Sequence, residues 1–317
     1  MLKDEIEKRA EIINRAIERF LPEMEPEGLY SAARHLIKAG GKRLRPVISL
    51  LIAEALGKDY KRIIPAAVSV ETVHNFTLVH DDIMDRDEMR RGVPTVHRVY
   101  GEATAILAGD TLFAEAFKLL TKCDTEPENI VKAVETLSNV CIKICEGQYM
   151  DMSFESRDVI SEEEYLEMVK LKTGVLIAAS SSLPAILLGE DEDVVNSLWE
   201  YGILSGIAFQ IHDDVLDLTE NTGKDWGSDL LKGKKTLIVI KAFEDGVKLN
   251  TFGKQVASEE EIRYDIEKLK KCGAIDYAVI RAREYAEQAK ERLTILPESD
   301  AREVLIELTD YLVRRKK

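Results

Sequence analysis

Two short acidic clusters are the residues of this chain whose types and spacing could bind a metal ion. HDDIMD occupies residues 80–85, and HDDVLD occupies residues 212–217. In a helix, Asp81 and Asp85 share one face with Cβ atoms about 5–6 Å apart, and the second cluster has the same spacing. Two such charges repel by about 2–3 kcal/mol at an effective dielectric of about 20. Cations would neutralise them, and ligation by oxygen alone favours Mg²⁺ over zinc or calcium. For either cluster alone, an exposed acidic helix end is the alternative.

The side chains that precede each cluster on its helix face predict a surface for an apolar ligand. On the first face they are small and mostly apolar: Ala67, Val70, His74 and Thr77. On the second face they are Gly202, Gly206, Phe209 and Gln210. A glycine inside a helix costs about 1 kcal/mol relative to alanine. Gly202 and Gly206 therefore indicate either room for a ligand or close packing of another helix, and both interpretations stay open.

Basic residues are concentrated in a few short segments, although the chain as a whole is acidic. With 44 Lys and Arg against 58 Asp and Glu, the net charge is −14, which argues against non-specific nucleic-acid binding. Arginine grips phosphate through two nitrogens, whereas lysine acts as a mobile point charge. Any one of these segments alone is more often a solvated loop, but together they predict two phosphate-binding sites; the segments are GGKRLRP, MRRGVP, KTG and GKDWGSDLLKGKKT.

The rest of the chain reads as helix. Apolar residues recur at three- and four-residue steps through residues 1–20, as in one stripe of an amphipathic helix. Ser161 with Glu164 and Ser258 with Glu261 are typical of capping boxes that open helices. No segment alternates like a strand, and no low-complexity linker divides the chain. We predict one all-α domain over residues 1–317, with ten or more helices.

The sequence also predicts a soluble, cytoplasmic protein. The N-terminus MLKDEIEKRA has no apolar signal region, and the longest uncharged run, residues 173–189, contains three serines and Pro184. It falls short of a membrane span. Cys141 and Cys145 lack the spacing of common zinc or redox sites, so the four cysteines are expected to be reduced core residues.

These motifs, taken together, resemble those of a known family. GGKRLRP, HDDIMD followed by RRG, KTG, FQIHDDVLD and GSDLLKGKKTL occur in the order found in trans-prenyl diphosphate synthases. The chain looks most like the short-chain, archaeal-type geranylgeranyl diphosphate synthases, and the resemblance covers nearly its whole length. It implies the isoprenoid synthase fold, an all-α bundle around a central cavity, and a homodimer.

The resemblance also implies roles for individual residues. Three Mg²⁺ ions per active site would be bound by Asp81, Asp85 and Asp213, and Asp82, Asp214 and Asp217 would support them. The allylic diphosphate would contact Arg90, Lys172, Thr173, Gln210, Lys224 and Lys234, of which Lys172 and Lys224 are also counted as catalytic. Isopentenyl diphosphate would contact Lys42, Arg45, His74 and Arg91.

The implied reaction is ionisation, condensation and elimination, without a side-chain nucleophile. In the family, the residues four and five positions before the first aspartate help to set product length, and here they are Thr77 and Phe76. An aromatic residue beside a small one favours the twenty-carbon geranylgeranyl product, with a farnesyl or mixed product as the alternative. On a helical wheel Phe76 lies well off the Asp81 face.

Other functions fit the residues less well. A terpene cyclase has an Asn/Ser/Glu pattern as its second metal motif, and a di-iron bundle needs Glu-x-x-His pairs. A head-to-head synthase lacks this pairing of DDxxD with GGKRLRP, and a membrane prenyltransferase needs several spans. A non-catalytic partner subunit usually has an eroded aspartate motif, whereas both motifs are intact here.

Overall fold

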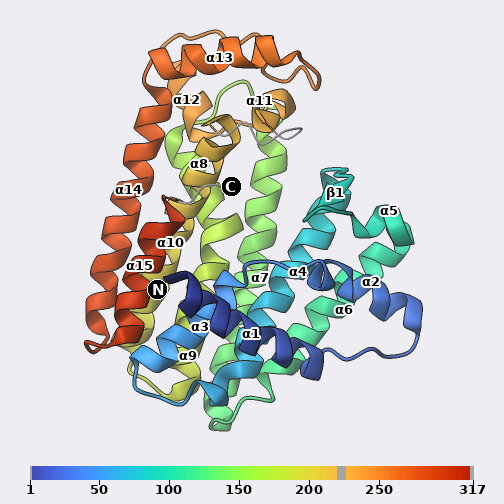
Figure 1. Ribbon diagram of the computed structural model, residues 1–317, viewed down its shortest axis with the longest axis vertical. Helices are drawn as coiled ribbons and strands as arrows, with labels where there is room; N and C mark the ends of the chain where they lie inside the picture. The colour runs from blue at the N-terminus through green and yellow to red at the C-terminus, as the bar shows by residue number, and fades with distance from the viewer. Residues whose placement is uncertain (1, 220–225, 315–317) are drawn as a thin grey trace. The chain divides into compact units, whose positions relative to one another are not determined.

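Helices make up most of the structure, a computed structural model that describes residues 2–219 and 226–314 (Figure 1). The predicted all-α fold, with more than ten helices, is confirmed. Up to residue 154 the helices are α1 (Leu2–Phe20), α2 (Glu27–Lys38), α3 (Leu44–Ala55), the 3₁₀ turn η1 (Tyr60–Ile63), α4 (Ile64–Met84), α5 (Val96–Tyr100), α6 (Glu102–Leu120) and α7 (Pro127–Phe154).

The second half of the chain continues in the same way. Its elements are α8 (Glu162–Val169), the π-helical turn η2 (Lys170–Gly174), α9 (Val175–Leu188), α10 (Glu192–Thr219), α11 (Ser228–Lys232), α12 (Leu237–Glu244), α13 (Glu259–Lys271), α14 (Ala274–Arg292), the 3₁₀ turn η3 (Leu293–Ile295) and α15 (Asp300–Leu312). The predicted capping boxes at Ser161 and Ser258 are both present, at the N-termini of α8 and α13.

The chain folds into two compact units. Unit 1 comprises Met1–Cys141, Ala179–Asn196 and Leu296–Leu305, and unit 2 comprises Ile142–Ala178, Ser197–Ile295 and Ile306–Lys317. The first aspartate cluster belongs to unit 1 and the second to unit 2. The helices α7, α9, α10 and α15 each have residues in both units. A single functional domain over residues 1–317 stays a prediction.

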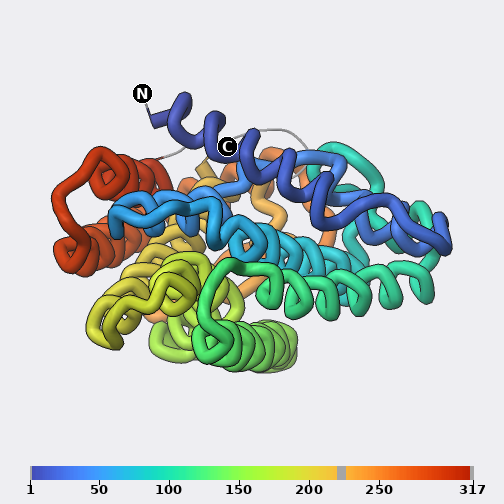
Figure 2. Tube along the Cα trace, turned by 90° about the horizontal axis from the view of Figure 1, so that it is seen from below, coloured from blue at the N-terminus to red at the C-terminus, as the bar shows by residue number. Residues whose placement is uncertain are grey.

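Unit 1 is built around α4, which packs along α6 (Figure 2). A run of α4 side chains from Pro65 to Val73 is buried. The two helices come close at Gly109 of α6, because a Cβ added there would lie 2.2 Å from Nε2 of His80. The histidine that precedes the first aspartate cluster therefore packs against α6, and any larger residue at position 109 would displace it.

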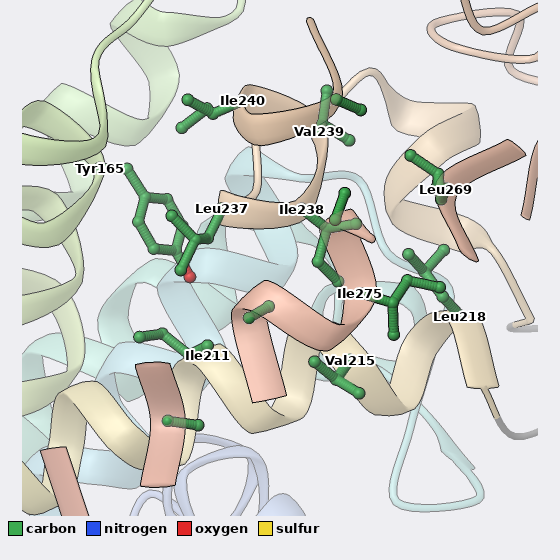
Figure 3. Close-up of a cluster of buried hydrophobic side chains, with 14 of the residues drawn as sticks. Tyr165, Ile211, Val215, Leu218, Leu237, Ile238, Val239, Ile240, Leu269 and Ile275 are labelled. Atoms are coloured by element: carbon green, nitrogen blue, oxygen red, sulfur yellow. The ribbon is translucent and has the colours of Figure 1, made fainter. Parts of the chain in front are cut away.

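The core of unit 2 is a cluster of apolar side chains contributed mainly by α8, α10, α12, α13 and α14. Figure 3 shows Tyr165, Ile211 and Leu237 within this cluster. Burial of such side chains stabilises a fold by about 25 cal/mol for each Å² of apolar surface removed from water. The second aspartate cluster is thus held on a helix whose opposite side lies in a packed core.

Within the described residues, a two-stranded hairpin departs from the helical pattern. Strands β1 (Met89–Arg90) and β2 (Val93–Pro94) pair antiparallel, with Met89 opposite Pro94 and Arg90 opposite Val93. The two turn residues, Arg91 and Gly92, have φ angles of 53° and 76°. Positive φ at both positions is typical of a type I′ turn, whose twist suits a two-residue hairpin. The hairpin fixes where both arginines project.

One helical stretch, Glu162–Leu188, is long and apolar enough to cross a membrane, and it extends beyond the uncharged run noted in the sequence. Inside the protein, 83% of its most apolar window is buried, so it is a core helix. The expectation that all cysteines are core residues is wrong for Cys145, which is exposed, whereas Cys123 and Cys141 are buried.

Candidate active site

The first aspartate cluster ends α4 and divides its carboxylates between two environments. Asp81 is half-buried, and Asp85, the C-cap of the helix, is exposed. Asp82 is fully buried and accepts a hydrogen bond from Nε of Arg90. Its other oxygen, Oδ2, has no hydrogen-bond partner among the described residues. Asp81 and Asp85 are therefore the more exposed carboxylates of this cluster, and Asp82 holds the hairpin through Arg90.

Burial also affects the charge of Asp82. Removal of this carboxyl group from water raises its pKa, and the adjacent Arg90 opposes the shift. Arg90 in turn lies 3.4 Å from Oδ2 of Asp87 through its Nη2. The guanidinium is thus held between two carboxylates at the base of the hairpin.

Unit 1 also brings together three residues predicted to contact isopentenyl diphosphate. Nη1 of Arg45 lies 3.5 Å from Nε2 of His74, and Arg91 is close enough to lower the pKa of both. The buried Nε of Arg45 has no hydrogen-bond partner among the described residues. A concentration of positive charge with an unsatisfied donor suits a phosphate group.

The pKa values in this cluster show the same concentration of positive charge. Burial lowers the pKa of Arg45 to about 10, with Arg91 adding to the shift and Glu71 opposing it. Burial also lowers the pKa of His74 well below its usual value, and the neighbouring arginines lower it further. The lowered pKa of His74 favours its neutral imidazole form.

The neighbouring residues of the GGKRLRP segment have different surroundings. Arg43 is buried and donates to Glu71, to the carbonyl of Ile37 and to Asn14, at 2.7, 2.7 and 3.0 Å. It therefore ties α3 to the helices around it. Lys42, one residue earlier, is exposed on the loop before α3.

The second aspartate cluster lies on α10 in unit 2. Asp213 is half-buried, whereas Asp214 and Asp217 are buried. Asp217 accepts hydrogen bonds from Oγ of Ser228 at 3.0 Å and from the backbone N–H of Asp229 at 3.1 Å. It therefore holds the start of α11. This leaves Asp213 as the carboxylate of this cluster with the most solvent access.

Asp214 accepts two hydrogen bonds, one at each carboxylate oxygen. The hydroxyl of Tyr165 donates to Oδ2 at 2.6 Å, and Nε2 of Gln210 donates to Oδ1 at 2.9 Å. Burial and the charge of Asp229 raise the pKa of Asp214 well above its usual value, and the two donors oppose that shift. Asp214 therefore holds the side chains of Tyr165 and Gln210 in place through these two hydrogen bonds.

Lys172 and Thr173 lie in the π-helical turn η2 between α8 and α9. Single π turns inside α-helices are frequent at functional sites. Nζ of Lys172 donates to Asp151 of α7 at 2.6 Å, and Oγ1 of Thr173 donates to Oε1 of Gln210 at 3.1 Å. Unit 2 therefore brings together three of the residues predicted for the allylic diphosphate.

Close helix packing explains the glycines of α10. A Cβ at Gly202 would lie 2.2 Å from Cα of Ala178, and one at Gly206 would lie 2.5 Å from Cα of Gly174. Real Cβ atoms do not approach backbone so closely. Of the two interpretations left open by the sequence, the structure favours close packing, which sets Gln210 beside Thr173.

Two further lysines, Lys224 and Lys234, were predicted to contact the allylic diphosphate. Nζ of Lys234 lies 3.5 Å from Oδ1 of Asp229, and its backbone N–H donates to the carbonyl of Asp229. Lys224 lies outside the described residues. Asp217, Asp229 and Lys234 thus form a connected group at α11.

The two residues predicted to set product length face different neighbours. The ring of Phe76 packs against His80 and against Phe113 of α6, with centroids 4.9 and 5.2 Å apart. Thr77 is half-buried, and its hydroxyl donates to the carbonyl of His74 at 2.8 Å. The separation of the two side chains on the helical wheel is borne out, because Phe76 packs against α6.

Magnesium would find oxygen donors at both clusters. Among the described residues, no group of three or more His, Cys, Asp or Glu side chains is placed to hold a metal ion. Magnesium commonly binds through one or two carboxylates and completes its octahedron with water and phosphate oxygens. The carboxylates of Asp81, Asp85 and Asp213 therefore fit an ion that arrives with a phosphate ligand.

Sequence reasoning missed the partners that come from other helices. Asp151 and Tyr165 each bond to a predicted site residue. Asp151 follows Gly147, whose added Cβ would lie 2.5 Å from the backbone nitrogen of Lys172. The sequence signal that could have pointed to Asp151 was the glycine four residues before it. Nothing in the sequence marked Tyr165, whose position reads as part of an apolar helix face.

Comparisons with known proteins give a consistent result. A profile of the polyprenyl synthetase family matches residues 26–272. The geranylgeranyl pyrophosphate synthase of Geoglobus acetivorans is 64% identical over 317 residues, which cover 99% of each chain. The geranylgeranyl diphosphate synthase of Methanosarcina mazei is 51% identical over 318 residues, with 99% and 98% covered. The solved structure of the Geoglobus protein matches with a TM-score of 0.95 and covers 98% of this chain and 99% of that one.

Proposed function

Because this chain belongs to the polyprenyl synthetase family, we infer that it is a geranylgeranyl diphosphate synthase. It is a prenyltransferase that condenses isopentenyl diphosphate with allylic diphosphates, head to tail. The observation that carries this inference is the 64% identity, over the full length of both chains, to a synthase of that name. Both aspartate motifs are intact, as the chemistry requires.

We propose that Asp81, Asp85 and Asp213 bind magnesium, three ions per active site. The support is that these carboxylates are the more exposed members of their clusters and offer only oxygen donors. Bound magnesium supplies positive charge that stabilises the diphosphate leaving group. The buried members have other tasks: Asp82 holds Arg90, and Asp217 holds the start of α11.

We propose that cationic side chains and hydrogen-bond donors bind the allylic diphosphate. Lys172 and Thr173 are supported by their position in the π turn, where Asp151 and Gln210 fix their side chains. Their charge and hydroxyl group stabilise the negative charge that develops as the C–O bond breaks. The full set is Arg90, Lys172, Thr173, Gln210, Lys224 and Lys234.

Isopentenyl diphosphate is held by Lys42, Arg45, His74 and Arg91. The unsatisfied Nε of Arg45 and the neutral imidazole of His74 support this assignment. After the allylic C–O bond has broken, the double bond of isopentenyl diphosphate attacks the allylic cation and forms the new C–C bond. The resulting cation loses a proton to the departing diphosphate, which gives the new double bond. Because the alkene itself is the nucleophile, no side-chain nucleophile is required, and holding it close to the allylic carbon accelerates the step.

The proposed main product is geranylgeranyl diphosphate, with twenty carbons. This proposal is supported by the aromatic Phe76, whose ring packs against Phe113 of α6, beside the smaller, half-buried Thr77. A farnesyl or mixed product is the alternative.

A cytoplasmic homodimer is the proposed working form. The helix α6 exposes large apolar side chains, with Ile106 41% and Leu107 58% exposed. Contiguous exposed apolar surface of this kind often marks a protein interface. The family profile spans residues of both compact units, which supports the proposal that they act as one catalytic domain.

A direct assay tests these assignments. The purified protein is incubated with Mg²⁺, labelled isopentenyl diphosphate and one allylic starter at a time, and product length is measured. Asp81→Ala and Asp213→Ala should lower turnover by orders of magnitude and keep the helical circular dichroism. Asp276→Ala, an exposed aspartate in the first turn of α14, is the matched control and should behave like wild type.

The same assay decides between the enzyme and a partner subunit. Incorporation by the purified chain alone excludes a non-catalytic subunit that acts only with a second protein. Near-native turnover in either aspartate variant would defeat the metal assignment.

A further inference from the structure

Tyr165 is buried in the core of unit 2, yet its hydroxyl group reaches a charged residue. The side chain is 2% exposed and lies among apolar neighbours from α10 and α12 (Figure 3). Its hydroxyl donates to Oδ2 of Asp214 at 2.6 Å. A short hydrogen bond from a buried hydroxyl to a carboxylate is among the stronger side-chain contacts.

Tyr165 is the first member of a chain of four hydrogen-bonded side chains. Gln210 donates from Nε2 to the second oxygen of Asp214, and Thr173 donates to Oε1 of Gln210. Both oxygens of Asp214 therefore have donors. Because Asp214 accepts only from the amide nitrogen of Gln210, the amide oxygen must face Thr173.

The backbones in this region are fixed by the glycine contacts between α10 and the η2–α9 segment. Gly206 and Gln210 are four residues apart on α10, as are Gln210 and Asp214, so all three share one side of the helix. Gly206 meets Gly174, the residue after Thr173. With the backbones held, the direction of the Thr173 hydroxyl depends on the side chains of the hydrogen-bonded chain.

We propose that Tyr165 is a positioning residue for the allylic diphosphate site. It holds Asp214 in one rotamer, Asp214 orients the Gln210 amide, and Gln210 sets the hydroxyl of Thr173. The inference rests on the proposed assignment of Thr173 and Gln210 to the allylic diphosphate. Without the tyrosine hydroxyl, Oδ2 of Asp214 is a buried acceptor with no donor, and the carboxylate turns to find one.

The test compares Tyr165→Phe with Tyr201→Phe. Tyr201 is also fully buried in unit 2, and its hydroxyl contacts Thr309 at 3.1 Å, outside the proposed site. Each variant loses one buried hydroxyl, so each should melt at a lower temperature. In Tyr165→Phe alone, the KM for the allylic diphosphate should rise by about tenfold, the loss expected for one hydrogen bond to a charged group. The KM for isopentenyl diphosphate should stay within about twofold.

Each outcome decides the inference. An unchanged allylic KM, an equal rise for both substrates, or the same rise in Tyr201→Phe overturns the positioning role. If Tyr165→Phe does not fold, Asp214→Asn tests the next residue of the hydrogen-bonded chain, since an amide group cannot accept from both Tyr165 and Gln210. An unchanged KM for the allylic diphosphate in Asp214→Asn also overturns the positioning role. Wild-type turnover and its loss in Asp213→Ala test the proposed function separately, because neither measurement involves Tyr165.

Discussion

The contact between Gly206 and Gly174 makes Gly206→Ala an informative substitution. A Cβ at position 206 would lie 2.5 Å from Cα of Gly174, whereas carbon atoms pack at about 3.5–4.0 Å. The atom it meets belongs to the backbone and has no rotamer to change. The two helical segments must therefore separate by about 1 Å to admit one methyl group.

The size of the effect follows from two opposing contributions. Overpacking costs about 1–3 kcal/mol, and a rigid backbone partner puts this site at the upper end. Alanine inside a helix is more favourable than glycine by about 1 kcal/mol, which offsets part of this cost. The net loss is about 2 kcal/mol in the free energy of unfolding. For 317 residues, an unfolding entropy of about 2.1 cal/mol/K per residue converts this to a melting temperature about 3 °C lower.

The same movement should impair catalysis, because Thr173 precedes the displaced Gly174. A misplacement of about 1 Å in a positioned group can cost about 100-fold in rate. Thermal melting followed by circular dichroism and steady-state kinetics measure the two effects. Gly28→Ala in α2 is the matched control, because a Cβ there meets nothing within 4 Å. It should turn over like wild type and melt at the same temperature or, from the gain in helix propensity, up to about 1.5 °C higher.

The stability measurement discriminates between the two explanations of the glycine. If Gly206→Ala melts like the wild-type protein, the methyl group is accommodated and the packing explanation is wrong. Lost activity with unchanged stability would then indicate that Gly206 leaves room for a ligand.

Three further predictions follow from individual residues. Phe76→Ala removes a ring from the contact with Phe113 and should lengthen the product in a chain-length assay. An unchanged product distribution would show that Phe76 does not set product length. His74 has a pKa well below its usual value when folded, so the unfolded chain binds the extra proton, and stability should fall as pH drops below about 6.5. Denaturant titrations at several pH values should show a weaker dependence in His74→Gln, and an identical dependence would contradict the assignment. Finally, Mg²⁺ with inorganic diphosphate should stabilise the protein by about 2.7 kcal/mol when the ligand concentration is about one hundred times its dissociation constant. Chelation of the metal should abolish the resulting shift in melting temperature. A shift that persists in Asp213→Ala would exclude that aspartate as a ligand.

The sequence motifs correctly predicted the all-α fold and the polyprenyl synthetase family, and the structural details that the sequence predicted correctly are those within one helix. The stripe through residues 1–20 forms α1, with Ile13 and Ile17 buried, and the capping boxes at Ser161 and Ser258 start α8 and α13. The common face of Asp81 and Asp85 follows from the same 3.6-residue repeat. Local spacing suffices for these predictions, because the partners are one turn apart in the same element.

The tertiary structure alone decided which residues meet across helices. The sequence left Gly206 with two explanations until Gly174 was seen against it, and it gave no indication that the hydroxyl of Tyr165 reaches the carboxylate of Asp214. Such partners lie many residues apart in the chain. Their meeting depends on which helix faces pack together and on the distance at which the backbones settle, and neither quantity is set by the periodicity of one helix.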